Sequence, residues 1–258
     1  MSSISVLGTV IVNGVHWLYK LIDSIDYSID NFVIFNNNGR NQLTTDLDKL
    51  KNIDHAFIKK IHVCHLPANL GCSTAWNLII KSFVTSPYWV IANHDISFTP
   101  GFLETLYTKS LDPQVGIIHG ARGEFNIGTW DIFLIKDWVI EKYGLFDENF
   151  YPAYNEDWDY LLRFIHDPVK KDFVNVPYYH GDTLEYAKSG GQTYKLETDP
   201  ATRYKIDLAR HLNETEYMDK KWGPTWAKYI PYKFPHVDTN LGNFTYDLNF
   251  IRKKYIGF

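Results

Sequence analysis

The first half of the chain alternates short apolar runs with amphipathic segments. Ile4–Val12 is rich in β-branched residues and stops at Asn13-Gly14, which predicts a buried strand. Between Val15 and Ile25, apolar residues recur at helical spacing. The same patterns predict strands at Phe32–Phe35, Ile61–Leu66, Tyr88–Ala92 and Val115–His119, and helices at Asp46–Leu50, Ser73–Phe83 and Phe102–Lys109. This alternation predicts an α/β fold with a mostly parallel central sheet flanked by helices.

The second half is less regular. The patterns there predict strands at Thr129–Ile135 and Phe173–Tyr179, helices at Asp137–Tyr143, Asn155–Ile165 and Arg203–Leu212, and a loop at Gly181–Gly191. No repeat or clear linker divides the chain. The segment after residue 212 is rich in Trp, Tyr and Pro, and we expect an aromatic-rich C-terminal extension packed on the main body.

Four predicted strands end in polar or turn-forming residues. These ends are Asn13-Gly14, Asn36-Asn37, Pro67-Ala68-Asn69 and Asn93-His94-Asp95. Ligands of open α/β sheets usually bind in the crevice at the carboxyl ends of the strands, which makes this edge the candidate site. Polar loops also follow strands in proteins without such a site, so this pattern alone leaves both interpretations open.

Composition narrows the class of protein. The 258 residues are 45% hydrophobic and 16% aromatic, which excludes a disordered chain. A net charge of −4 and the lack of a dense Lys/Arg cluster argue against nucleic-acid binding through general basicity. Cys64 and Cys72 are expected to be reduced thiols. With neither a signal peptide nor a transmembrane segment in the pattern, we expect a cytoplasmic protein.

Several common site motifs are absent. The sequence has no GxxxxGK[ST] phosphate loop, no GxGxxG after the first strand and no GxSxG. Nucleoside triphosphatases, NAD-dependent dehydrogenases and nucleophile-elbow hydrolases therefore lack support. His62 and Cys64 face the opposite side of a strand from His65, which argues against a zinc site there.

Asp95 is the first candidate for chemistry. An apolar strand delivers its carboxylate to the strand's end, and Pro100-Gly101 opens a helix soon afterwards. A carboxylate in this position suits a cation that holds phosphate oxygens. The alternative is that Asp95 only caps the following turn.

A second candidate is the start of the helix predicted at Asn155–Ile165. Glu156, Asp157 and Asp159 crowd there, and stabilisation by the helix dipole is one explanation. The aromatic residues around them favour a binding cleft in which a carboxylate serves as general base. These aromatics are Tyr151, Tyr154, Trp158 and Tyr160. Arg163 is expected to pair with Asp159, with phosphate binding as the alternative.

Together, the two segments resemble the GT-A-fold nucleotide-sugar glycosyltransferases of the inverting family 2, and most of all its rhamnosyltransferase-like members. That family shows Asp-x-Asp or Asn-x-Asp before a Pro-Gly helix start, then Gly-Leu-Phe-Asp-Glu and Glu-Asp-x-Asp…Arg. Here the pattern reads Asn93-His94-Asp95, Pro100-Gly101, Gly144–Glu148 and Glu156–Arg163. The resemblance implies a GT-A domain over residues 1–212, with a nucleotide-sugar-binding half at 1–120, an acceptor and catalytic half at 121–212, and an extension at 213–258.

The resemblance also implies roles for single residues. Asp157 is the expected base, with Glu156 and Asp159 in support, while Asp95 and His180 are expected to bind Mn²⁺ or Mg²⁺. Contacts to the nucleotide sugar are implied for Thr9, Val10, Asn13, Asn36, Asn37, Asn69, Gly71, Asn77, Asn93 and His94. The flat rings of Trp130, Tyr154 and Trp158 are candidates for sugar stacking, and equally for core packing.

The implied activity moves a sugar from a nucleotide-diphosphate donor, for example a UDP-sugar, to a hydroxyl of a glycan or glycoconjugate, with inversion. Two departures bear on it: Asn93 replaces the first metal-binding Asp, and Asn36 replaces an Asp near the base. A non-catalytic nucleotide-sugar or carbohydrate-binding module is therefore the alternative, followed by a retaining transferase or a nucleotidyltransferase. Segments 179–181 and 189–191 are expected to form a lid over the donor or a plain surface loop.

Overall fold

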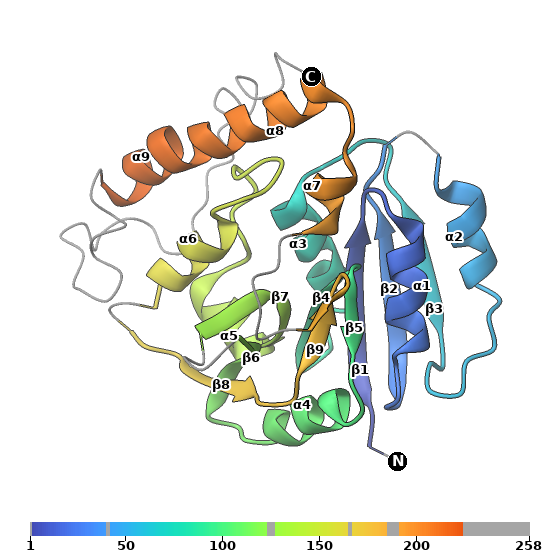
Figure 1. Cartoon of the computed structure of the whole chain (residues 1–258). Helices are drawn as coiled ribbons and strands as arrows, with labels where there is room; N and C mark the ends of the chain where they lie inside the picture. Colours follow the sequence, from blue (N-terminus) through green and yellow to red (C-terminus); the bar gives the residue numbers. More distant parts are fainter. Residues whose placement is uncertain (1, 40–41, 123–126, 165–166, 185–190, 224–258) are drawn as a thin grey trace.

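The computed structural model describes residues 2–39, 42–122, 127–164, 167–184 and 191–223 (Figure 1). The strands of the main sheet are β1 (Ile4–Ile11), β2 (Ile29–Asn36), β3 (Ile61–His65), β4 (Tyr88–Asn93), β6 (Val115–Arg122), β7 (Ile127–Lys136) and β8 (Lys170–Val174). Their order is β3-β2-β1-β4-β7-β6-β8. All pairs are parallel except the two that β7 makes with β4 and β6. The predicted α/β fold with a mostly parallel sheet is confirmed.

A second, smaller sheet lies beside the first. It contains β5 (Ile96–Phe98), β9 (Tyr178–His180) and β10 (Thr183–Leu184) in the antiparallel order β10-β9-β5. The prediction of one strand at Phe173–Tyr179 is wrong, because β8 and β9 belong to different sheets. Pro177 lies between them and has no N–H to continue a ladder. The small sheet pairs His180 with Ile96, directly after Asp95.

Helices cover both faces of the main sheet. They are α1 (Val15–Asp23), α2 (Thr44–Leu50), α3 (Cys72–Ser82), α4 (Phe102–Ser110), α5 (Asp137–Tyr143), α6 (Glu156–Leu162), α7 (Gln192–Leu196), α8 (Pro200–Leu212) and α9 (Met218–Trp222). One apolar cluster contains side chains of α1, α2 and α4, and another contains those of α3, α5 and α6. Gly8 of β1 lets α3 approach closely, because an added Cβ would lie 2.4 Å from Ile79. The sheet is thus buried on both sides.

The C-terminal part of the described chain is one helical run. A π-helical turn, η2 (Asn213–Tyr217), joins α8 to α9. Tyr217, Met218 and Trp222 pack with Phe150 and Leu162 in a third apolar cluster. The domain boundary predicted at residue 212 falls inside this run and stays a prediction. The aromatic residues of the tail at 226, 229 and 232 lie outside the described residues.

None of the described helices is both long enough and apolar enough to cross a membrane. Within the described residues, α6 is shorter than the predicted helix at Asn155–Ile165. It begins at Glu156 because Asn155 has a left-handed conformation, with φ of 74°. The two acidic residues Glu156 and Asp157 are therefore the first two residues of the helix.

Candidate functional site

The start of α6 is held in an unusual backbone conformation. Tyr154 and Asn155 have φ values of 77° and 74°, which non-glycine residues rarely adopt. Just before them, the carbonyl of Pro152 accepts a 2.7 Å hydrogen bond from the backbone N–H of Cys72 at the start of α3. A strained backbone persists only where the surrounding structure holds it in place, and such residues are concentrated at functional sites.

The first two carboxyl groups of α6 both have raised pKa values. Burial and the neighbouring Asp157 raise the pKa of Glu156 to about 8, and the Cys72 thiol forms a hydrogen bond to Glu156. Burial also raises the pKa of Asp157, and the charge of Asp131 raises it further. The Oδ1 atom of Asp157 accepts a 2.8 Å hydrogen bond from the N–H of Trp158. A carboxylate with a raised pKa is a stronger base, which suits proton transfer near neutral pH.

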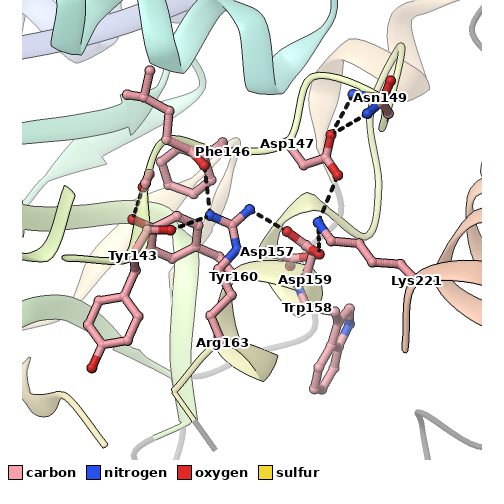
Figure 2. Close-up of polar contacts among 12 residues, drawn as sticks. Tyr143, Phe146, Asp147, Asn149, Asp157, Trp158, Asp159, Tyr160, Arg163 and Lys221 are labelled. Atoms are coloured by element: carbon pink, nitrogen blue, oxygen red, sulfur yellow. Dashed lines mark hydrogen bonds and ion pairs between the residues drawn. The ribbon is translucent and has the colours of Figure 1, made fainter. Parts of the chain in front are cut away.

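Asp159 lies in a different environment. Its side chain is fully buried and lies 2.6 Å from both Arg163 Nη2 and Lys221 Nζ (Figure 2). Trp222 Nε1 also donates to it, at 2.8 Å. Burial tends to raise the pKa of Asp159, but the charges of Lys221 and Arg163 lower it overall. The predicted Asp159–Arg163 pair is confirmed. The oxygens of Asp159 are held by these cations, and the supporting catalytic role expected for Asp159 stays a prediction.

The ion pairs around Asp159 continue into a larger buried network. Arg163 donates hydrogen bonds of 2.9 and 2.7 Å to the carbonyls of Tyr143 and Leu145. Lys221 also lies 2.7 Å from Asp147 Oδ2, in the loop before α6 (Figure 2). The network joins α6, this loop and α9, so the C-terminal helix fixes the helix that carries the predicted base.

A second group of charged residues lies at the carboxyl end of β4. His180 Nε2 is 3.2 Å from Asp95 Oδ2, and His180 Nδ1 is 3.1 Å from Asp131 Oδ2. All three side chains are buried. Burial opposes the charged form of His180, yet the hydrogen bonds to Asp131 and Asp95 raise its pKa to about 10. Burial likewise tends to raise the pKa of Asp95, but the contact with His180 lowers it to about 2. The structure thus brings the two predicted metal ligands together.

Helix α7 lies across the same strand ends. The backbone N–H of Gln192 donates a 2.7 Å hydrogen bond to Asp95 Oδ2. Asn13 Nδ2 donates to the carbonyl of Thr193 at 3.0 Å. Three other buried atoms near these strand ends, Thr9 Oγ1, Asn13 Oδ1 and His94 Nε2, have no hydrogen-bond partner among the described residues. Buried polar atoms without a partner are rare, and a bound polar ligand would satisfy them.

Three of the predicted nucleotide contacts form one polar cluster. Asn37 Nδ2 donates to Asn69 Oδ1 and to the carbonyl of Gly71, both at 3.2 Å, and Asn37 Oδ1 accepts from Leu70 N–H at 2.7 Å. Asn36, at the end of the same strand, instead bonds His65 Nδ1 at 3.0 Å. The structure therefore places these residues together at the ends of β2 and β3.

Asn77 lies apart from that cluster. Its amide donates to the carbonyl of Phe146 and to Glu148 Oε1, at 2.8 and 2.9 Å, and accepts from Phe146 N–H at 2.9 Å. These bonds give Asn77 a bracing role between α3 and the loop before α6. Val10 and Asn93 are half-buried at the ends of β1 and β4, beside Asp95 and Thr9.

The three candidate sugar-stacking rings differ in exposure. Trp130 is 8% exposed and packs against Phe133 and Phe146 in the core. This position fits the core-packing alternative, and sugar stacking by Trp130 stays a prediction. Trp158, directly after the predicted base, is 40% exposed. The ring of Tyr154 is half-buried, with the guanidinium of Arg210 at 5.0 Å from its centroid. Of the three rings, Trp158 and Tyr154 alone have surface available for a sugar.

Sequence patterns did not identify three residues that contact the site. Asp131 is a charged residue within the apolar strand β7, and a charge at such a position indicates a buried polar site. Gln192 contributes its backbone N–H, which no side-chain pattern reports. Lys221 is far from α6 in sequence, and only the fold brings it to Asp147 and Asp159.

Two residues of the charged group carry atoms of the kind that divalent ions bind. Among the described residues, no group of three His, Cys, Asp or Glu side chains is arranged to hold a metal. Asp95 nevertheless offers an oxygen, and His180 Nε2, 3.2 Å away, offers a nitrogen in the neutral form of the imidazole. Mg²⁺ and Mn²⁺ sites that also use substrate phosphates need only one or two protein carboxylates or comparable ligands. The residues present therefore fit an ion completed by a bound diphosphate.

The chain resembles many solved structures, and three of them follow. S. aureus TarS residues 1–349 with UDP-GlcNAc is 12% identical with a TM-score of 0.55, over 83% of this chain and 67% of that one. The mannosyltransferase PcManGT from Pyrobaculum calidifontis, with GDP-Man and Mn²⁺, is 13% identical with a TM-score of 0.55, over 98% and 73%. GalNAc-T7, with UDP, GalNAc and Mn²⁺, is 11% identical with a TM-score of 0.61, over 98% and 54%. At these identities the likeness establishes the GT-A fold alone.

Comparison of sequences gives the family. No curated protein sequence matches the chain. The sequence profile described as "Glycosyl transferase family 2" matches residues 9–151, which is more than half of the 258 residues. That stretch includes the strand ends with Asp95 and stops just before the helix with Asp157, and the match supports glycosyl transfer. The chain belongs to glycosyl transferase family 2.

Proposed function

We propose that this protein transfers a sugar from a nucleotide-diphosphate-sugar donor to a hydroxyl group of a glycan or glycoconjugate, in one displacement with inversion. The observation that supports the proposal best is the position of Asp131. Its carboxylate lies 3.1 Å from His180, and its charge also raises the pKa of Asp157. The proposed donor side and the proposed base therefore both interact electrostatically with the same buried carboxylate.

In the proposed reaction, Asp157 accepts the proton of the acceptor hydroxyl. The hydroxyl oxygen forms a bond to the anomeric carbon of the donor while the bond from that carbon to the diphosphate oxygen breaks. The nucleoside diphosphate leaves on the opposite face, which inverts the anomeric configuration. Asp95 and His180 would hold Mn²⁺ or Mg²⁺, which supplies positive charge to the departing diphosphate.

We propose that the donor binds at the carboxyl ends of β1, β2 and β4. The unpartnered Thr9 Oγ1, Asn13 Oδ1 and His94 Nε2 atoms support this position, as does the cluster around Asn37. The similar structures hold UDP-GlcNAc, GDP-Man and UDP, so UDP- and GDP-sugars are the first donors to test. Hexoses and deoxyhexoses such as rhamnose are the sugars we propose.

Donor binding at these strand ends requires α7 to move. The Gln192 N–H bonded to Asp95, and the Thr193 carbonyl bonded to Asn13, occupy groups that we assign to the donor site. We therefore propose that α7 itself acts as the lid. Of the lid expected from sequence, residues 179–181 and 191 are described, and 189–190 lie outside the described residues.

A cytoplasmic location is also part of the proposal. Cys64 and Cys72 are both free thiols, as predicted, which fits a reducing compartment. Acceptor glycans that are built on the cytoplasmic side of a membrane would be accessible there.

A non-catalytic nucleotide-sugar-binding module is the second candidate. One observation favours it: Asn93 stands where the family has a metal-binding Asp, and among the described residues no third His, Cys, Asp or Glu completes a metal site. Such a module would bind the donor and leave it intact.

A panel of UDP-, GDP- and dTDP-sugars with Mn²⁺ tests the proposed function. We expect one donor to release its nucleoside diphosphate slowly by hydrolysis, and faster with an acceptor glycan. Tight donor binding without release, for every acceptor offered, would instead establish the binding module. Pyrophosphate release from a nucleoside triphosphate would contradict both.

A further inference from the structure

Strand β7 departs from regular pairing next to the charged group. Its register with β6 jumps from His119↔Phe133 to Ala121↔Gly128, so that one residue of β6 lies opposite four of β7. In a regular strand, residues three apart point to opposite faces. Trp130 and Phe133 instead pack in the same apolar cluster. Such irregularities redirect side chains and are common beside active sites.

The irregular segment places Asp131 at the proposed donor side. Ile132 forms the last pair of β7 with β4, opposite Ala92, and Asp131 and Asn93 are the residues next to this pair in each strand. Asn93 is the position where the family pattern has a carboxylate. Asp131 thus adds a buried carboxylate next to Asn93-His94-Asp95 from another strand, with 7% of its surface exposed.

Asp131 is itself held by the small sheet. The hydroxyl of Tyr178 donates a 3.1 Å hydrogen bond to Asp131 Oδ2. Gly120 makes room for Tyr178, because a Cβ at this position would lie 2.7 Å from the tyrosine ring. His180, two residues after Tyr178, contacts the same Asp131 oxygen through Nδ1. The opposite nitrogen, Nε2, then lies at Asp95.

This series of contacts has a well-defined physical consequence. A histidine whose Nδ1–H is held by a carboxylate has a fixed ring orientation and presents Nε2 as a more basic donor. Removing such a carboxylate typically weakens metal affinity 10- to 100-fold. In this protein the contacts of Tyr178, Asp131, His180 and Asp95 link the small sheet to β7 and to the end of β4.

We propose that Asp131 is a positioning residue that fixes the ring of His180 so that Nε2 faces Asp95. The inference rests on the proposed function in taking Asp95 and His180 as the donor-side metal pair. Asp131 replaces, from β7, the fixed negative charge that is absent at Asn93. It acts through His180 and does not itself contact the substrate.

Mn²⁺ binding by the full chain tests this assignment. Free Mn²⁺ is measured by electron paramagnetic resonance, with Mn²⁺ alone and with added UDP, for the wild type, Asp131→Ala and Asp131→Asn. Asp172→Ala, which removes a carboxylate on β8 that pairs with Lys109, is the matched control. Pulsed resonance of bound Mn²⁺ reports the coupling to a histidine nitrogen.

We expect Asp131→Ala to weaken Mn²⁺ binding 10- to 100-fold and to reduce the histidine coupling, with a smaller loss in Asp131→Asn, whose amide oxygen still accepts from Nδ1–H. The control should stay within about twofold of the wild type. Unchanged affinity and coupling in Asp131→Ala would overturn the assignment. If that variant does not fold, Asp131→Asn gives the same readouts, and unchanged values there overturn it.

A separate result distinguishes failure of the proposed function from failure of the positioning role of Asp131. If the wild type itself binds no Mn²⁺, with or without UDP, the proposed metal pair is wrong. The crystal structure of the metal-free variant then decides the role of Asp131. A His180 ring turned away from Asp95 supports the positioning role, and a ring that keeps the 3.2 Å contact overturns it.

Discussion

Asp157 and Asp159 lie two residues apart on α6, yet their surroundings act on them in opposite directions. Asp159 is fully buried with Arg163 and Lys221 at 2.6 Å, and these cations lower its pKa. Asp157 has a raised pKa, because burial and the nearby Asp131 both disfavour its charged form. The role of a carboxylate in this acidic motif therefore depends on whether a cation is held beside it, and its position in the motif alone does not define that role.

The difference between the two carboxylates assigns a stabilising role to Asp159 and a reactive one, in the proposed mechanism, to Asp157, within one turn of α6. A carboxylate held by two cations gains little from taking up a proton, since protonation would leave those cations uncompensated. A carboxylate without a cation accepts a proton readily. Asp159 therefore anchors α6 to α9, whereas Asp157 is the carboxylate that accepts the acceptor's proton in the proposed mechanism.

The largest expected effect is on activity when the proposed base is removed. Asp157→Asn keeps the size of the side chain and removes its ability to take a proton. We expect transfer to fall by about 10²–10⁴-fold, the usual contribution of a general base. The unfolding temperature should not fall, because Asp157 forms no ion pair with a cation of the described residues. Initial rates of nucleoside-diphosphate release and a thermal melt measure the two quantities.

Asp167→Asn is the control for this variant, because Asp167 is an exposed carboxylate that forms its ion pair with Lys142, on α5. Its activity should match that of the wild type. Full transfer activity in Asp157→Asn would remove Asp157 from the mechanism.

The next effect is on stability when the anchoring carboxylate is neutralised. Asp159→Asn leaves Arg163 and Lys221 buried without their shared anion. Breaking a buried pair in this way typically costs about 3–5 kcal/mol, and we expect a loss of this size in the free energy of unfolding. Urea unfolding followed by tryptophan fluorescence measures it.

A double-mutant cycle sharpens that result. Lys221→Met removes one of the two cations, and the double variant with Asp159→Asn should be more stable than the sum of the single losses predicts, by about 0.5–3 kcal/mol. Strictly additive losses would show that the Lys221–Asp159 contact does not contribute to stability.

The last effect, largest at alkaline pH, concerns the pH dependence of stability at Glu156. Its folded-state pKa of about 8 lies above the ordinary value of 4.5, so the folded protein holds this proton more tightly than the unfolded chain. The resulting stabilisation is fully present below about pH 4.5 and is lost as the pH rises through 8. Glu156→Gln cannot ionise, and it should gain stability relative to the wild type at alkaline pH.

A difference of one pKa unit between the folded and unfolded states corresponds to about 1.4 kcal/mol of stability. A gain in stability of Glu156→Gln that reflects only part of the pKa shift is therefore measurable. Thermal melts of both proteins between about pH 5 and pH 9.5 bracket the loss and provide the test. A constant difference between the two melting temperatures across this range would show that Glu156 has an ordinary pKa.

Sequence patterns located the central sheet well because strands such as Ile4–Ile11 are continuous apolar runs bounded by turn residues. They failed where structure depends on short or distant pairing. β5 has only three residues, and β8 and β9 merged into one prediction because the apolar run hides the change of sheet at Pro177.

The site residues likewise divide into those that local sequence patterns predict and those that depend on contacts between distant segments. Asp95, His180 and Asp157 stand in recognisable motifs, and the structure brings Asp95 and His180 into contact. Asp131 and Lys221 stand in no motif, because they act through contacts between elements distant in the chain. The buried positions of Trp130 and Asn77 likewise depend on the packing around Phe146, which the sequence alone does not show.

The anomeric configuration of the transferred sugar tests the central claim most directly. Once a donor is identified, proton NMR of the product formed in the first minutes, before any mutarotation or hydrolysis, reports the coupling of the anomeric proton. A single displacement assisted by Asp157 predicts a product whose configuration is opposite to that of the donor. A product with the donor's configuration would contradict the account.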